Sequence, residues 1–342
     1  MKYWSFTEGF GLENLALKTG ARPRPGPRDV LLEMHAASLN YRDLVVLRGQ
    51  HGRMVQPPLI PLSDGAGVIV DKGSDVHDFK IGDRVSPAFY QHWQGGPPPA
   101  DLEVGRLGGP LDGVLATYCV FPASSLVSIP SHLTYEEAAT LPCAGVTAWS
   151  ALSEPLPLRP GETVLILGTG GVALLAIALA KACGARTIVT TSSAQRAEKI
   201  RDFGADIVID RSQEENWAQR VRTETGGLGC DRVLELGGAA TLGQSIKAVR
   251  TGGTIILIGN VTGNNAELFL PLVLTRRLTL HSVSCGSRSA FEAMNRALAL
   301  HEIRPVIAKT IPFDRAPEAF QALEHNDGVG NICVGSYQEG SG

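Results

Sequence analysis

The sequence lacks a strong excess of charge of either sign and is poor in aromatic residues. Its 342 residues carry 31 Lys and Arg against 34 Asp and Glu, a formal net charge of −3, and aromatic residues make up 6%. A nearly neutral chain has no strong field for a phosphate backbone, so we expect no nucleic acid among its partners. Hydrophobic residues make up 44% of the chain, which excludes disorder as its main state.

Signal peptides, membrane spans and paired cysteines are also missing. The N-terminus has no apolar run typical of a signal peptide. The longest apolar stretch, residues 164–182, is broken by glycines near its start, so we expect a buried strand, a turn and a buried helix and no membrane partner. The six cysteines are scattered and form no C-x-x-C pair. Reduced thiols in a cytoplasmic protein fit this pattern better than a secreted disulfide scaffold.

Two different patterns follow each other along the chain, whose length suggests about two domains. The first third is rich in strand signals and ends in a Gly/Pro-rich loop over residues 94–113. After about residue 145, short apolar strands alternate with helices. This alternation predicts βαβ units and a parallel sheet. The expected strands are 163–167, 187–191, 207–209, 232–236 and 254–258, and the expected helices are 171–183, 195–203, 216–225 and 242–249.

A glycine-rich turn joins the first of these strands to the first of these helices. Its sequence, Gly168-Thr169-Gly170-Gly171-Val172-Ala173, matches G-x-G-x-x-A. Gly168 permits a tight turn, Gly170 lets the backbone approach a pyrophosphate, and Ala173 lets the helix pack closely on the sheet. The start of the helix then offers N–H groups to the phosphates. Because the turn follows a strand and opens a helix, it predicts a dinucleotide site, with a turn chosen only for packing as the alternative.

The end of the second strand indicates which dinucleotide is bound. An NAD site has an acidic residue there, which accepts hydrogen bonds from the ribose hydroxyls. This sequence has hydroxyl residues and a nearby cation instead, namely Thr191, Ser192, Ser193 and Arg196. Arginine suits phosphate recognition. We therefore expect NADP(H) to be preferred over NAD(H), although Arg196 also fits an ordinary solvated helix face.

A third cofactor segment is expected after the strand 254–258, where Gly259 and Asn260 follow. In a doubly wound sheet, ligands bind at the carboxyl ends of the strands. These two residues are therefore predicted to lie near the nicotinamide half of the cofactor, with simple strand-to-loop punctuation as the alternative.

Further motifs flank the glycine turn on both sides. They are Leu39-Asn40-Tyr41-Arg42-Asp43, Pro61-Leu62-Ser63-Asp64-Gly65-Ala66-Gly67-Val68, Gly82-Asp83-Arg84-Val85, Ala138-Ala139-Thr140-Leu141-Pro142-Cys143-Ala144-Gly145 and Gly330-Asn331-Ile332-Cys333-Val334. Together they resemble the medium-chain dehydrogenase/reductase superfamily over essentially the whole chain, closest to its quinone oxidoreductase-like and zinc-type alcohol dehydrogenase-like branches.

The resemblance implies an α/β fold with two domains and an assembly. A β-rich GroES-like catalytic domain would span residues 1–145, completed by 288–342, and a Rossmann domain with a doubly wound parallel sheet would span 146–287. Asn331 would belong to the cofactor-binding residues, and the protein would form a homodimer or homotetramer.

The same resemblance shows where zinc ligands would stand. Zinc-dependent members have a Cys at the position of Asn40 and a His-Glu pair at Ser63-Asp64, so that only Cys143 matches a ligand. Residues 94–113, where the structural zinc lobe would lie, contain no Cys. A catalytic zinc needs three good protein ligands. We therefore expect no metal in this chain.

Zinc-free relatives mostly deliver a hydride from NADPH to a quinone or to the C=C bond of an α,β-unsaturated carbonyl, a small molecule whose oxygen needs only a hydrogen-bond donor. The resemblance places Asn40 beside the nicotinamide, with Tyr41 or His51 bonding the acceptor oxygen or supplying the proton. A solvent-exposed loop is an equally good reading of His51. Two alternatives remain: a metal-free alcohol dehydrogenase or aldehyde-ketone reductase, and a non-catalytic NADPH-binding sensor or crystallin-like protein.

Overall fold

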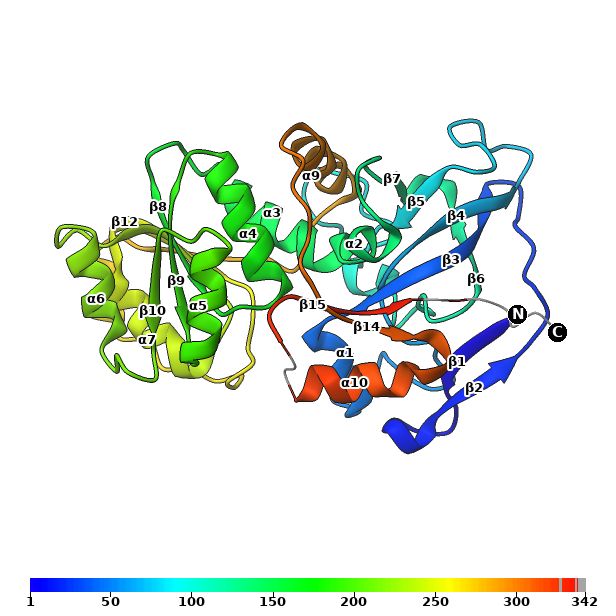
Figure 1. The fold of residues 1–342 in the computed structure, drawn as a ribbon, viewed down its shortest axis with the longest axis horizontal. Coiled ribbons are helices and arrows are strands. Elements are labelled where there is room, and N and C mark those ends of the chain that lie inside the picture. The colour runs from blue at the N-terminus through cyan, green and yellow to red at the C-terminus, as the bar shows by residue number, and fades with distance from the viewer. Residues whose placement is uncertain (326–327, 336, 338–342) are drawn as a thin grey trace. The chain divides into compact units, whose positions relative to one another are not determined.

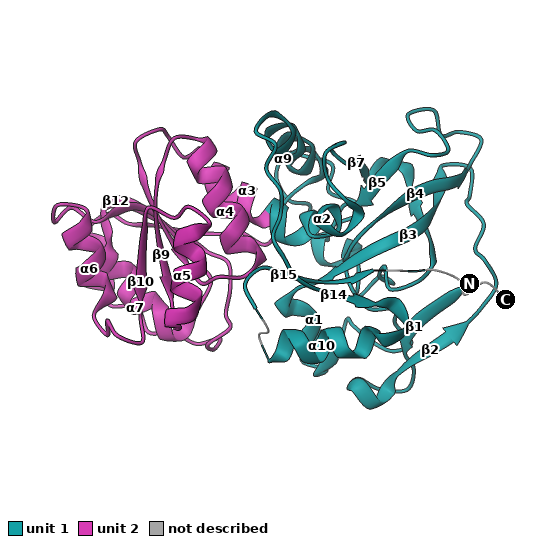
Figure 2. Cartoon of the chain, in the orientation of Figure 1, with its two compact units in different colours: residues 1–146, 285–342 teal, residues 147–284 magenta. Residues whose placement is uncertain are grey.

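The computed structural model describes residues 1–325, 328–335 and 337. The chain divides into two compact units (Figure 2). Unit 1 holds residues 1–146 and 285–342, and unit 2 holds residues 147–284. Against the expected Rossmann span of 146–287, unit 2 therefore begins one residue later and ends three residues earlier.

The main sheet of unit 1 follows the order β14-β15-β3-β4-β5-β7, and β6 pairs with β3 off this path (Figure 1). β1 and β2 form a separate antiparallel pair. The strands are β1 (Lys2–Phe6), β2 (Leu15–Thr19), β3 (Asp29–Leu39), β4 (Asp64–Lys72), β5 (Arg84–Pro87), β6 (Tyr118–Pro122), β7 (Leu126–Ser128), β14 (Ile307–Pro312) and β15 (Asn331–Gly335).

The pairing of β3 with β4 positions the residues of interest in unit 1. Ser38 near the end of β3 stands opposite Asp64 at the start of β4. Asn40 follows β3 directly and precedes α1, so residues distant in sequence meet at one end of these strands. The helical segments are α1 (Tyr41–Leu47), α2 (Tyr135–Ala139), the π-helical η4 (Leu141–Gly145), α9 (Arg288–Leu300), α10 (Ala316–Glu324) and the 3₁₀ turns η1 (Leu12–Asn14), η2 (Leu102–Gly105), η3 (Ala123–Ser125) and η5 (Phe313–Arg315).

Unit 2 is built on a six-stranded parallel sheet with the order β10-β9-β8-β11-β12-β13. After β8, the chain adds β9 and β10 on one side of β8 and then adds β11, β12 and β13 on the other side. The direction in which strands are added therefore reverses between β8 and β11. Ligands of doubly wound sheets bind at this reversal, beyond the carboxyl ends of the strands. The strands are β8 (Thr163–Leu167), β9 (Arg186–Thr191), β10 (Ile207–Asp210), β11 (Cys230–Glu235), β12 (Val249–Leu257) and β13 (Thr279–Ser282).

Helices connect these strands, and apolar side chains from both pack into one core that includes Leu165, Ile188, Val233 and Ile255. Strand β8 is apolar and buried at Val164–Leu167 because helices cover both faces of a parallel sheet. The helices are α3 (Val146–Ser153), which begins at the last residue of unit 1, α4 (Gly171–Ala182), α5 (Ala194–Asp202), α6 (Trp217–Glu224), α7 (Ala239–Ala248) and α8 (Leu270–Thr275).

The structure corrects several expectations about individual elements. α7 begins at Ala239, three residues before the expected start, because the chain turns into the helix directly after Gly238. α8 and the edge strand β13 were not expected, and the Gly/Pro-rich segment 94–113 contains η2. None of the helices in the described part of the chain is long and apolar enough to cross a bilayer.

Candidate active site

The glycine turn of unit 2 has the geometry of a phosphate-binding loop. Gly168 has φ +100°, a conformation that glycine adopts without a steric penalty. Gly170 has φ −83° and precedes the first residue of α4, and having no side chain it provides no side-chain cap for that helix. A Cβ built on Gly168 or Gly170 meets no described heavy atom within 4 Å. The backbone therefore leaves open space where a pyrophosphate would approach the N–H groups at the start of α4.

The end of β9 lies next to this turn. The Gly168 N–H donates to the Thr190 carbonyl at 2.9 Å. The hydroxyl Oγ1 of Thr190 is buried and has no partner among the described residues. Ser193 caps α5, its hydroxyl accepting the N–H of Arg196 at 3.5 Å. The predicted hydroxyl segment Thr191–Ser193 thus stands at the same sheet edge as the glycine turn.

The loops after β11 and β12 meet at this edge as well. Gly238 has φ +94°, and a Cβ there would lie 2.7 Å from Cα of Asn260. Buried Glu235 holds the first loop, its Oε1 accepting the N–H groups of Gly237 at 2.9 Å and Gly238 at 3.0 Å. The amide of Asn260 donates to Asn264 at 2.6 Å. Gly259 and Asn260 therefore lie at the carboxyl end of β12, where the sequence predicts the nicotinamide half.

Unit 1 contains a fully buried carboxyl group, that of Asp64, beside the predicted site residue Asn40. Asp64 is 0% exposed; its Oδ1 accepts the Ser63 hydroxyl at 2.6 Å and its Oδ2 accepts the Cys143 N–H at 2.8 Å. Burial raises the pKa of Asp64 to about 7, against the lowering effect of these hydrogen bonds and of the nearby Asn40 amide. The Nδ2 atom of Asn40 is buried and makes no well-aligned hydrogen bond with any described residue.

His51 lies beside two arginines. Nη2 of Arg106 is 3.4 Å from Nδ1 of His51. Burial, followed by the charges of Arg42 and Arg106, lowers the pKa of His51 to about 4, so the ring is neutral at pH 7. A guanidinium has only donors, so this contact favours Nδ1 as the acceptor and Nε2 as the nitrogen that carries the proton. Nε2 of His51 is buried and has no partner in the described part of the chain.

The two arginines are held by backbone carbonyls and acidic side chains. Arg42 donates to Gly108 O at 3.2 Å and pairs with buried Asp43 at 3.1 Å. Arg106 donates to Gly109 O at 2.8 Å and pairs with Glu103. Neither arginine depends on His51 for its position, so the contact with His51 is available to orient the imidazole.

Four side chains stand where the resemblance places zinc ligands. They are Asn40, Ser63, Asp64 and Cys143, of which the amide and the hydroxyl are poor zinc ligands. A hydrogen bond with Cys285, and then burial, raise the pKa of the Cys143 thiol well above its usual value, which opposes the thiolate that zinc requires. Across the described residues, no group of three or more His, Cys, Asp or Glu side chains is placed to hold a metal ion.

Two other predicted site residues, Tyr41 and Asn331, interact with residues outside the predicted site. Tyr41 is 37% exposed and its phenol interacts with Arg48. The amide of Asn331 donates to the Val306 carbonyl at 3.2 Å, a contact between two segments of unit 1. Of the two predicted oxygen donors, the geometry therefore favours His51, and the cofactor role of Asn331 stays a prediction.

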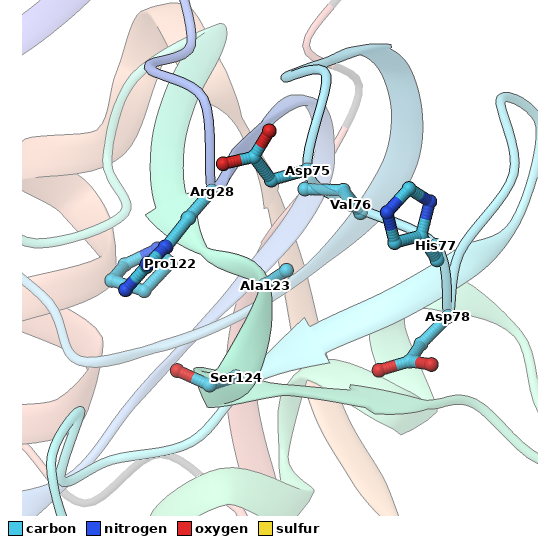
Figure 3. A pocket seen from close by; sticks show the side chains of 8 residues that line it. All are labelled: Arg28, Asp75, Val76, His77, Asp78, Pro122, Ala123 and Ser124. Atoms are coloured by element: carbon cyan, nitrogen blue, oxygen red, sulfur yellow. The ribbon is translucent and has the colours of Figure 1, made fainter.

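A surface hollow on unit 1 of about 340 Å³ lies elsewhere (Figure 3). It includes none of the predicted site residues. Its lining consists of Arg28, Asp75, Val76, His77, Asp78, Pro122, Ala123 and Ser124.

Three structural features of the site were not expected from the sequence. They are the contact of Arg106 with His51, the buried hydrogen bonds of Asp64, and the position of Arg211, whose N–H donates at 2.7 Å to the carbonyl of Thr191 at the end of β9. No local sequence signal marks them, because each arises where distant segments meet.

Comparison with known proteins identifies matches along most of the chain. Residues 26–131 match the family "Alcohol dehydrogenase GroES-like domain", and residues 171–300 match the family "Zinc-binding dehydrogenase". A zinc-type alcohol dehydrogenase-like protein of Schizosaccharomyces pombe is 40% identical, over 90% of this chain and 91% of that protein. An acryloyl-coenzyme A reductase of Metallosphaera sedula is 30% identical, over 91% of this chain and 93% of that protein.

Solved structures share the fold over nearly the full length. A putative alcohol dehydrogenase of Sinorhizobium meliloti superimposes with a TM-score of 0.93 at 38% identity, covering 98% of both chains. A quinone oxidoreductase of Pseudomonas syringae gives 0.82 at 26% identity, covering 98% and 99%. A mycobacterial protein in complex with NADPH gives 0.82 at 27% identity, covering 98% and 100%.

Proposed function

Because the chain belongs to the medium-chain dehydrogenase/reductase superfamily and is an oxidoreductase of that type, we propose that it is an NADP(H)-dependent, zinc-independent reductase. Its acceptor would be a quinone or an α,β-unsaturated carbonyl compound. The names of relatives support this choice: one is an acryloyl-coenzyme A reductase, one a quinone oxidoreductase, and one was solved with NADPH.

The observation that carries the proposal is a buried donor without an acceptor among the described residues, Nε2–H of His51. An unsatisfied buried donor destabilises a protein by about 1–3 kcal/mol, so this one points to an acceptor that the substrate would supply. A substrate oxygen is such an acceptor. When hydride reaches the carbon conjugated to a carbonyl or the ring of a quinone, negative charge develops on that oxygen, and fixed donors stabilise it.

The residues of unit 1 have distinct parts in this reaction. His51 holds the acceptor oxygen through Nε2–H and stays neutral, because burial and then the charges of the two arginines disfavour its cation. A neutral imidazole is a hydrogen-bond donor but too weak an acid to protonate carbon near pH 7, so the proton that completes the reduction comes from solvent. Asn40, whose amide lies beside Asp64, orients the nicotinamide ring and the substrate. Asp64 accepts the Cys143 N–H at 2.8 Å and so fixes that part of the backbone.

The cofactor site of unit 2 supports the same reading. When bound, a dihydronicotinamide cofactor supplies the hydride. The open turn at Gly168 and Gly170 fits its pyrophosphate, and the absence of an acid at Thr191–Ser193 favours a 2′-phosphate.

Zinc independence is part of the proposal. It is supported by the amide at Asn40, the hydroxyl at Ser63 and the raised thiol pKa of Cys143. Assembly as a homodimer or homotetramer and a cytoplasmic location stay predictions, which size-exclusion chromatography with light scattering and localisation of a tagged chain would test.

An acceptor panel tests the function. Purified protein, treated with a chelator, is mixed with NADPH and a quinone, an enone or an aldehyde, and absorbance loss at the nicotinamide band is followed. We expect turnover with the quinone or the enone and little with the aldehyde. Turnover with the aldehyde alone would support the alternative of a carbonyl reductase, and no turnover with any acceptor would support a non-catalytic binding protein.

A further inference from the structure

We propose that Arg211, a residue outside the predicted cofactor segments, binds the 2′-phosphate of NADP(H) and is the main residue selecting NADP(H) over NAD(H). This inference rests on the proposed function, since it assumes that the glycine turn of unit 2 holds the cofactor pyrophosphate.

Arg211 stands at the correct edge of the parallel sheet. It follows the last residue of β10, Asp210, which is in register with Thr191, the last residue of β9. The N–H of Arg211 donates to the Thr191 carbonyl at 2.7 Å. Thr190, one residue earlier, accepts the N–H of Gly168 at 2.9 Å. Arg211 is thus attached to the strand end where a doubly wound sheet binds the ribose of the adenosine half.

The side chain of Arg211 lacks the partner that a half-buried guanidinium normally has. Its Nε is buried without a hydrogen-bond acceptor among the described residues, and the described part of the chain shows no ion pair with it. Burial lowers the pKa of Arg211, while the charges of Glu235 and Asp210 raise it. A guanidinium stays charged under these conditions, so Arg211 places a positive charge near Glu235 and Asp210 at this end of the sheet.

The two acidic neighbours accept hydrogen bonds from groups other than Arg211. Glu235 accepts the Gly237 and Gly238 amides and the hydroxyls of Thr241 and Ser245. Oδ1 of Asp210 accepts the N–H of Ser212 at 2.9 Å and its hydroxyl at 2.7 Å. Glu235 is therefore fully engaged by other donors, whereas Oδ2 of Asp210 is buried and makes no hydrogen bond with a described residue, Arg211 included. A phosphate monoester can accept hydrogen bonds from the other N–H groups of the guanidinium. Thr191 and Ser192, at the end of β9, carry hydroxyls that can donate to the same phosphate.

Arg196, the cation that the sequence predicts for this role, is the natural comparison. It lies in the first turn of α5, where its N–H meets the capping hydroxyl of Ser193. Arg196 and Arg211 thus approach the end of β9 from different elements, and substitutions separate their contributions.

The test measures binding and needs no turnover. Wild-type protein and the variants R211Q, R211K and R196Q are titrated with 2′,5′-ADP and with 5′-AMP by isothermal calorimetry, after thermal unfolding confirms that each is folded. We expect wild type to bind 2′,5′-ADP more tightly than 5′-AMP. R211Q should lose at least about tenfold in affinity for 2′,5′-ADP, the scale of a lost charge-assisted pair, and change little for 5′-AMP. R211K should fall between, and R196Q should keep most of the preference.

Different failures identify different errors. If R211Q keeps the preference for 2′,5′-ADP, or loses affinity for both ligands equally, the role of Arg211 is wrong while an NADP(H) site remains. If wild type itself binds the two ligands equally, the proposed NADP(H) preference is wrong as well. If R211Q does not fold, R211K is the deciding variant. Because lysine lacks the planar guanidinium, full retention of the preference for 2′,5′-ADP by R211K would contradict the proposed role of Arg211.

Discussion

Nη2 of Arg106 lies 3.4 Å from Nδ1 of His51, and this contact favours the tautomer whose proton is on Nε2. Arg106 also donates to the Gly109 carbonyl and pairs with Glu103, and these two contacts hold its side chain in place. The result is a neutral imidazole whose free donor, Nε2–H, has no partner among the described residues.

Removal of the His51 donor should slow reduction. We expect H51L to lower kcat/KM for an enone or a quinone by about 10²–10³-fold, the scale for losing one donor to a developing oxyanion. H51Q retains an N–H and should lose less. NADPH affinity, measured by fluorescence, should be unchanged in both. Equal kcat/KM in wild type and H51L would remove His51 from the reaction.

The tautomer of His51 can be observed without any substrate. In ¹⁵N NMR spectra, we expect His51 to be neutral with its proton on Nε2 from pH 8 down to pH 5, since its pKa is lowered to about 4. R106M should raise that pKa and let both tautomers form, because it removes a charge and the donor to Nδ1. A wild-type His51 that titrates near pH 6.5 would contradict the electrostatic argument.

Asp64 should give the protein a distinct dependence of stability on pH. Its pKa is about 7 in the folded protein and near 3.8 when unfolded, so the folded state holds the proton more tightly. The stabilisation is therefore present at low pH and is lost as pH rises from about 4 to about 7, by about 4 kcal/mol in total. D64N, which cannot ionise, should become more stable relative to wild type over this range in urea unfolding. A constant difference between the two proteins would show that Asp64 stays ionised.

A methyl group at Gly170 should block the nucleotide without unfolding the protein. Its φ of −83° suits alanine, and the added Cβ meets no described atom within 4 Å, only the space assigned to the pyrophosphate. We expect G170A to unfold at nearly the wild-type temperature and to lose at least about tenfold in NADPH affinity.

Gly243 provides the matched control for this substitution. It lies inside α7, and a Cβ there also meets no described atom within 4 Å. G243A should stabilise the protein by about 0.5–1 kcal/mol and leave NADPH affinity unchanged. If G170A binds NADPH like G243A, the turn does not hold the pyrophosphate.

The sequence was sufficient for features that depend on local chemistry. The turn at Gly168 could be predicted because a strand, a positive φ and a helix start leave a pattern within six residues. The βαβ order of unit 2 was predictable from apolar periodicity. By contrast, α8 contains Pro271 and has no buried residue, so it lacks the apolar stripe that marks a helix.

The details of the site depend on long-range contacts and could not be predicted in the same way. The motif around Asp64 indicated a missing zinc ligand but not that Asp64 accepts the Cys143 N–H, 79 residues away. Likewise, Arg211 follows an unremarkable strand end, and its significance arises from the register of β10 with β9. Such features depend on which distant segments and strands come together, and the residues next to them in the sequence do not indicate this.

The most direct measurement follows the transferred hydride. Chelator-treated protein, shown free of zinc by elemental analysis, is incubated with 2-cyclohexenone and NADPH deuterated at the reactive C4 position, and the product is examined by NMR and mass spectrometry. The account predicts cyclohexanone with deuterium on the carbon β to the carbonyl. Deuterium on the carbonyl carbon of an allylic alcohol, or activity that appears only when zinc is restored, would contradict it.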